Sequence, residues 1–199
     1  MGRGRQNPYA RPDARTRAAK AAGYPARSVF KLEEIDRRVK LLRAGQHVVD
    51  LGAAPGSWSK YVVTRIGPSG RLLSVDLEPL SVPLPPTAEV ICGDVLGLDR
   101  ALLAKLAPYD VVLSDMAPHT TGNRSGDSWR SYELFERALD LARDTLKPGG
   151  SFVGKLFMGE SFEEARAKIA SCFAEVKIVR PDATRSMSME VFLVGLGAR

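Results

Sequence analysis

The stretch "HVVDLGAAPGSWSKYVV", residues 47–63, decides the fold. Its first five residues are mostly apolar and predict a buried strand, and its last seven carry apolar side chains at helical spacing and predict a helix. A short turn between them holds Gly52 and Gly56. A strand, a glycine-containing turn and a helix in this order are typical of the first unit of a doubly wound α/β sheet. In such folds this turn lies where nucleosides and nucleotides bind.

The chain on both sides of this stretch alternates between apolar strands and helices. The predicted strands occupy residues 47–52, 71–76, 88–94, 109–115, 151–157, 175–181 and 189–195. The predicted helices occupy residues 28–42, 57–67, 98–107, 128–147 and 161–173. A proline-rich segment, residues 80–86, replaces a helix between the second and third strands. The last two strands are joined by a loop too short for a parallel crossover, so the last strand should run antiparallel. We predict a doubly wound, seven-stranded, mostly parallel sheet with an antiparallel last strand, the Rossmann-like architecture typical of S-adenosylmethionine (SAM) methyltransferases.

Length and composition indicate a globular protein with one main domain. The chain has 199 residues, of which 44% are hydrophobic and 26% are charged. No apolar run approaches the length of a membrane span, and no signal peptide begins the sequence. Cys92 and Cys172 lie in apolar contexts without metal-type spacing, so we predict two free, buried thiols. These features predict a cytoplasmic protein without a membrane partner, and we expect a monomer.

Positive charge is concentrated at the N-terminus. Residues 1–27 carry seven Lys and Arg residues against one acid, Asp13, whereas the remaining residues carry 22 bases and 22 acids. An arginine-rich arm on a neutral body favours a polyanionic partner, most often a nucleic acid. A solvated tail and an organelle transit peptide are the alternatives. We therefore predict a basic, flexible RNA-binding arm at residues 1–26 and a catalytic domain at residues 27–199.

The glycine turn and two strand-end acids predict the cofactor. Pro55 has no N–H, and the spacing from Gly52 to Gly56 is not that of a pyrophosphate-binding loop, so a nucleoside without phosphates fits better. Asp76 ends the second strand, where a carboxylate accepts from ribose hydroxyls, and Asp94 follows the third strand, where it accepts from an adenine amino group. Each acid is also an ordinary turn or N-cap residue. Together with a third strand-end acid, Asp115, and the glycine turn, they favour SAM over another nucleotide.

A lysine within an apolar strand predicts a second cluster. Lys155 lies in "SFVGKLF" and needs a partner, because an unpaired buried ammonium is costly. Asp115, at the end of the adjacent strand, is the obvious partner. Glu190 opens the last strand at the same edge, and Lys31 on the helix before the sheet completes the set. The alternative is one buried ion pair and two surface charges.

The same blocks carry a family resemblance. "DLGAAPGSWSKYV", "SDMAP", "GKLF" and "SMSMEVFLV" resemble the signature blocks of the FtsJ-like ribose 2′-O-methyltransferases, in order from about residue 27 to the C-terminus. The resemblance implies a catalytic Lys-Asp-Lys-Glu tetrad at Lys31, Asp115, Lys155 and Glu190. It also implies that Gly56, Trp58, Asp76, Asp94 and Asp115 contact SAM. Ser57 departs from the family, in which a second glycine is common.

Within the family, the chain most resembles bacterial enzymes that methylate a uridine in large-subunit (23S) ribosomal RNA. The resemblance therefore implies a SAM-dependent methyl transfer to a uridine 2′-hydroxyl, without a metal, with ribosomal RNA or the large ribosomal subunit as partner. Lys155 would act as a neutral base or as a cation that steers the hydroxyl, and the residues leave both roles open. The alternative functions are 2′-O-methylation of transfer RNA or of an mRNA cap, and a non-catalytic ribosome-assembly factor.

Overall fold

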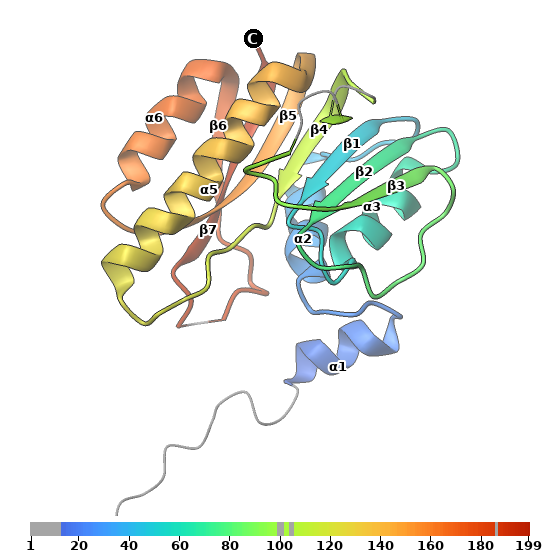
Figure 1. Cartoon of the computed structure of the whole chain (residues 1–199), viewed down its shortest axis with the longest axis horizontal. Coiled ribbons are helices and arrows are strands. Elements are labelled where there is room, and N and C mark those ends of the chain that lie inside the picture. Colours follow the sequence, from blue (N-terminus) through green and yellow to red (C-terminus); the bar gives the residue numbers. More distant parts are fainter. Residues whose placement is uncertain (1–12, 99–101, 104–105, 186) are drawn as a thin grey trace, which may run out of the picture.

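The computed structural model describes residues 13–98, 102–103, 106–185 and 187–199, and within them seven strands form one sheet in the order β3-β2-β1-β4-β5-β7-β6 (Figure 1). The strands are β1 (His47–Leu51), β2 (Arg71–Asp76), β3 (Ala88–Cys92), β4 (Tyr109–Ser114), β5 (Leu146–Phe157), β6 (Phe173–Val179) and β7 (Glu190–Ala198). Strands β1 to β5 are parallel along the sheet, and β7 runs antiparallel between β5 and β6. The predicted fold class is confirmed.

The two faces of the sheet are covered by different helices. The described helices are α1 (Ala14–Ala21), α2 (Val29–Val39), α3 (Ser57–Ile66), α5 (Arg124–Thr145) and α6 (Phe162–Cys172). On one face, Val48, Leu113 and Phe192 pack with side chains of α2 and α3. On the other, their neighbours Val49 and Val112 pack with side chains of α5 and α6. Successive strand residues point to opposite faces, so residue parity tells which helices a strand side chain meets.

Helix α5 begins at Arg124 and not at residue 128, because Asn123 caps it by accepting from the Gly126 N–H at 3.3 Å. Part of the helix predicted at residues 98–107 falls outside the described residues. Within the expected flexible arm, Ala14–Ala21 form a helix, α1, whose N-cap Asp13 accepts from the Thr16 N–H at 2.7 Å.

The segment between β2 and β3 contains no helix, as its prolines predict.

Cys92 and Cys172 are both free, as predicted, but neither is buried. Cys92 is exposed because β3 is the edge strand and presents much of its surface to solvent.

Candidate active site

Strand register brings three of the four predicted catalytic residues to one face of the sheet. Ser114 pairs with Gly154, so the next residues, Asp115 and Lys155, are neighbours across β4 and β5. On the other side of β5, Lys155 pairs with Phe192 and Phe157 pairs with Glu190, two residues before Phe192. By parity, Lys155 and Glu190 therefore share the face of Phe192, the face that α2 covers. Lys31 reaches the same place from α2.

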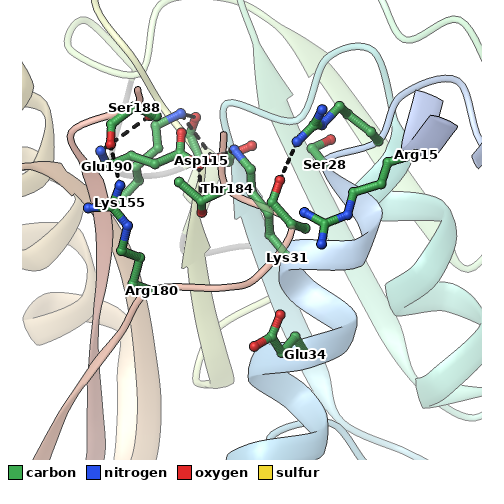
Figure 2. Close-up of polar contacts among 12 residues, drawn as sticks. Arg15, Ser28, Lys31, Glu34, Asp115, Lys155, Arg180, Thr184, Ser188 and Glu190 are labelled. Carbon is green, nitrogen blue, oxygen red and sulfur yellow. Dashed lines mark hydrogen bonds and ion pairs between the residues drawn. The ribbon is translucent and has the colours of Figure 1, made fainter. Parts of the chain in front are cut away.

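The four side chains form two ion pairs (Figure 2). The Nζ of Lys155 lies 2.9 Å from Oδ1 of Asp115 and donates a hydrogen bond to the Asp115 main-chain carbonyl. The Nζ of Lys31 lies 2.5 Å from Oε1 of Glu190, which also accepts from the Thr184 hydroxyl at 3.2 Å. The Lys155 side chain is only 7% exposed. The predicted partnership of Lys155 with Asp115 is confirmed, and the set is two buried or half-buried pairs, not one pair and two surface charges.

A cavity of about 250 Å³ opens at the carboxyl ends of the first four strands. We call it the acidic cavity. It is lined by Gly52, Ala54, Asp76, Leu77, Gly93, Asp94, Val95, Asp115, Met116, Ala117 and Leu134. Three carboxylates and no basic side chain line it, so it suits a cationic ligand with apolar parts and disfavours a phosphate. SAM, a sulfonium with a nucleoside and no phosphate, meets that description.

Local hydrogen bonds orient the two strand-end acids of the acidic cavity. Asp76 Oδ2 accepts from the Ala54 N–H at 2.8 Å, and its Oδ1 accepts from the Glu78 N–H at 2.9 Å. Asp94 Oδ1 accepts from the Leu96 N–H at 2.9 Å. Each oxygen has two lone pairs, so these carboxylates still have acceptor capacity for hydroxyl or amino groups. The turn role and the ligand role that the sequence left as alternatives are therefore compatible in the same residue.

The glycines of the first turn are required by the chain's own packing. Gly52 has φ +76°, and a Cβ there would lie 2.8 Å from the Met116 main-chain nitrogen. Gly56 has φ +106°, and a Cβ there would lie 2.4 Å from Val82. Gly52 lines the acidic cavity and Gly56 does not. The glycines thus let the turn lie against Met116 and the segment after β2.

The side chain of Trp58 lies in the core and not in the acidic cavity. Its side chain is 2% exposed, its indole N–H donates to the Ser28 carbonyl at 2.9 Å, and its ring packs 5.7 Å from that of Phe192. The indole is therefore part of the core between α3 and the sheet and does not line the acidic cavity. Only the main chain of Trp58 remains for a ligand, in the first turn of α3, where N–H groups have no intrahelical acceptor.

A second cavity, of about 350 Å³, lies beside the Lys31–Glu190 pair. We call it the arginine cavity. It is lined by Ala26, Arg27, Ser28, Lys31, Ala183, Arg185, Met187, Ser188 and Glu190. Burial and the charge of Arg185 lower the pKa of Arg27 from its ordinary value. Arg27 donates to the Ala183 carbonyl and pairs with Asp13, which ties α1 and the β6–β7 loop to this cavity. The three basic side chains that line the arginine cavity, against one acidic one, suit an anionic ligand.

Most of the arginine cavity was not predicted from the sequence. Arg27 was counted only among the basic residues of the first 27, and Arg185, Met187 and Ser188 were not singled out. The one available signal was the position of Arg185, five residues before Glu190 in the loop that leads to the predicted catalytic strand.

Asp50 on β1 is a further buried acid that the sequence reasoning did not single out. It is fully buried, and its Oδ2 accepts from the Ser59 hydroxyl at 2.7 Å. Its Oδ1 has no hydrogen-bond partner among the described residues. Burial, with smaller contributions from the charges of Asp115 and Asp76, raises the pKa of Asp50 to about 7. Asp115 and Asp76, which line the acidic cavity, therefore lie close enough to Asp50 to disfavour its charged form.

Comparison with known proteins agrees with this geometry. Residues 24–198 match the family described as FtsJ-like methyltransferase. The chain is 61% identical to ribosomal RNA large subunit methyltransferase E of Sorangium cellulosum, over 96% of this chain and 90% of that protein. It is 46% identical to the protein of the same name from Myxococcus xanthus, over 96% and 92%.

Solved structures share the fold. A Plasmodium falciparum protein assigned as a ribosomal RNA methyltransferase superimposes with a TM-score of 0.77 at 22% identity, over 88% of this chain and 98% of that one. Aeropyrum pernix fibrillarin, solved with bound SAM, gives a TM-score of 0.59 at 15% identity, over 85% and 76%.

The sheet order and the acidic cavity at its switch point define a Rossmann-like enzyme of the methyltransferase class. The chain belongs to the FtsJ-like methyltransferase family. It is a SAM-dependent methyltransferase. In the described part of the chain, no helix has the length and apolar character needed to cross a membrane. The same residues contain no cluster of three His, Cys, Asp or Glu side chains arranged to hold a metal ion.

Proposed function

We propose that this enzyme transfers the methyl group of SAM to the ribose 2′-hydroxyl of a uridine in large-subunit ribosomal RNA. The observation that carries the proposal is the Lys155–Asp115 pair. Asp115 lines the acidic cavity, while the neighbouring pair of Lys31 and Glu190 lines the arginine cavity. The two ion pairs thus contribute residues to two different cavities, Asp115 to the acidic cavity and Lys31 with Glu190 to the arginine cavity. The curated relatives named as large-subunit ribosomal RNA methyltransferases support the choice of RNA.

The acidic cavity would hold the methyl donor. When bound there, SAM supplies a methyl group on a positively charged sulfur. Asp76 and Asp94 would accept hydrogen bonds from its ribose hydroxyls and adenine amino group, and Gly52 and Asp115 would lie near its aminoacyl and sulfonium end. Neither Gly56 nor the side chain of Trp58 lines this cavity. Any contact of these two residues with SAM would therefore come from main-chain atoms.

The arginine cavity would hold the RNA. Arg27 and Arg185 would pair with phosphates next to the target nucleotide. The Lys31–Glu190 pair would bound the space in which the ribose is held, with Glu190 fixed by Thr184.

Lys155 would act as a cation. Its ammonium donates to the Asp115 carbonyl and faces the Asp115 carboxylate, which leaves further N–H capacity for the target hydroxyl oxygen. Held in this way, the oxygen keeps a lone pair free for attack along the line to the methyl carbon. SAM would supply the methyl group to this oxygen, and Lys155 would hold the oxygen in place while the hydroxyl proton passes to solvent. Alignment and a fixed charge, rather than a covalent intermediate, would supply the acceleration.

The proposal is tested by nucleoside mass spectrometry. Purified protein and SAM are incubated with large ribosomal subunits that lack the modification, with free 23S ribosomal RNA, with transfer RNA and with capped mRNA, and each RNA is digested to nucleosides. We expect 2′-O-methyluridine from the large-subunit RNA and no new methylated nucleoside from the other two. Methylation of transfer RNA alone, or of the cap alone, would show that this RNA is the substrate and not large-subunit ribosomal RNA. The absence of transfer to any RNA, with the large subunit still bound, would favour a non-catalytic assembly factor.

A further inference from the structure

A third cavity, of about 200 Å³, lies on the other side of the segment that leads into β7. We call it the tryptophan cavity. Arg124, Ser125 and Trp129 line it from the first turns of α5, Met158 and Glu160 from the segment after β5, and Met189 from the residue before Glu190. Nothing in the methyl-transfer mechanism uses it.

Trp129 gives the tryptophan cavity an aromatic surface. Its side chain is 54% exposed, and it is the only largely exposed aromatic residue in the described part of the chain. The indole is also supported from beneath, because the ring of Tyr132 lies 5.7 Å away and is itself buried. Tyr132 is held by Glu164, whose carboxylate accepts from its hydroxyl at 2.7 Å. The exposed indole therefore rests on a rigid base.

The tryptophan cavity adjoins the arginine cavity. Met187, Ser188 and Glu190 line the arginine cavity, and Met189 lines the tryptophan cavity. The same four consecutive residues thus form the wall between the two. The Met158 N–H donates to the Met189 carbonyl at 2.8 Å, which fixes this wall to the end of β5, one residue beyond Phe157, the strand partner of Glu190.

We propose that the tryptophan cavity binds an unpaired base of single-stranded RNA, one that flanks the target nucleotide, by stacking on Trp129. This inference rests on the proposed function, since it assigns a second subsite to the same RNA. Proteins that bind unpaired RNA stack its bases on exposed aromatic rings. Arg124 pairs with the backbone phosphate at the rim. Glu160 makes the interior unsuitable for a phosphate and suitable for the N–H groups of a base edge, and the Ser125 hydroxyl both donates and accepts.

Fluorescence offers a readout that is independent of catalysis. The chain has two tryptophans, and the other, Trp58, is buried. Titration with a single-stranded oligouridylate of ten residues should quench emission and protect it from iodide, and a duplex RNA of the same length should do neither. Trp129→Phe should lose the quenching and keep the affinity, since a ring remains. Trp129→Ala should bind the oligouridylate about tenfold more weakly.

Ile178→Ala is the matched control, because Ile178 is a large apolar side chain on β6 with 48% exposure. It should leave affinity and quenching unchanged. In methyl transfer to large subunits, Trp129→Ala should raise KM about tenfold with little change in kcat. The inference would be overturned if the oligouridylate did not quench the emission of the wild-type protein and if Trp129→Ala kept the wild-type affinity and KM. If the wild-type protein transfers no methyl group to ribosomal RNA, the proposed function fails, and the oligouridylate titration still decides whether this cavity binds bases.

Discussion

Asp115 contacts Lys155 through both its side chain and its main chain, with a carboxylate oxygen 2.9 Å from the lysine nitrogen and the carbonyl accepting a hydrogen bond from it. Both groups are largely buried. Breaking a buried pair by removing one partner is strongly destabilising, because it leaves an uncompensated charge. We therefore expect Asp115→Ala to lower the free energy of unfolding by roughly 3 kcal/mol. Adding Lys155→Met should restore part of the loss. Urea denaturation of the two single variants and the double variant measures this, and equal stability of the single and double Asp115 variants would show that the ion pair does not matter.

Asp76 should contribute a charge-assisted hydrogen bond to the cofactor. Asp76→Ala should weaken SAM binding by about 1.5–3 kcal/mol in calorimetry. Glu78→Ala is the control, because Glu78 is an exposed acid two residues away that does not line the acidic cavity. Since Asp76 also accepts from the N–H groups of Ala54 and Glu78, the thermal stability of both variants must be measured alongside. Unchanged affinity in a folded Asp76→Ala protein would remove this residue from the cofactor site.

Asp50 should make stability depend on pH. Its pKa is about 7 when folded, against an ordinary value of 3.8, so between these values the folded chain holds a proton that the unfolded chain has lost. Its contribution is therefore greatest below about pH 4 and is lost as the pH rises to about 7, at up to about 1.4 kcal/mol per pH unit. Asp50→Asn should remove this slope. The difference in unfolding free energy between wild type and Asp50→Asn, measured from pH 4 to pH 8, should shift in favour of Asn with rising pH and then level off near pH 7. A constant difference would mean that Asp50 ionises as in the unfolded chain.

The N-terminal arm should contribute to RNA affinity through charge. Deleting residues 1–12 removes Arg3, Arg5 and Arg11 and leaves α1 with its cap Asp13 in place. RNA affinity should fall, and the slope of log K against log salt should become less steep by up to about 3. Deleting residues 1–20 should cost more, because Arg15 donates to the Asp182 carbonyl of the β6–β7 loop and Asp13 pairs with Arg27. SAM affinity should be unchanged in both truncations. An unaltered salt slope would show that the arm makes no phosphate contacts.

A contact could be predicted from the sequence where one physical requirement applied to residues within regular strands. A lysine in an apolar strand needs an acidic partner, and the order of parallel strands leaves Asp115 as the neighbour, so the pair could be predicted. The buried position of the Trp58 ring could not be predicted, because it depends on packing between α3 and β7. The arginine cavity was also out of reach. The β6–β7 loop takes its place through contacts with distant residues, among them Glu34, which accepts from the Asp182 N–H at 2.8 Å, and Arg27.

We expect Lys155 to act on the target hydroxyl and not on the cofactor. Single-turnover transfer of a labelled methyl group from SAM to unmodified large subunits measures this. Lys155→Ala should bind SAM nearly as tightly as the wild type and show no transfer above background. Asp115→Ala should lose both SAM affinity and transfer, and the double variant should be little slower than Lys155→Ala, as expected for residues that act as a unit. A near-normal rate for Lys155→Ala would show that Lys155 does not act on the hydroxyl, and would leave Asp115 as a cofactor ligand beside a structural lysine.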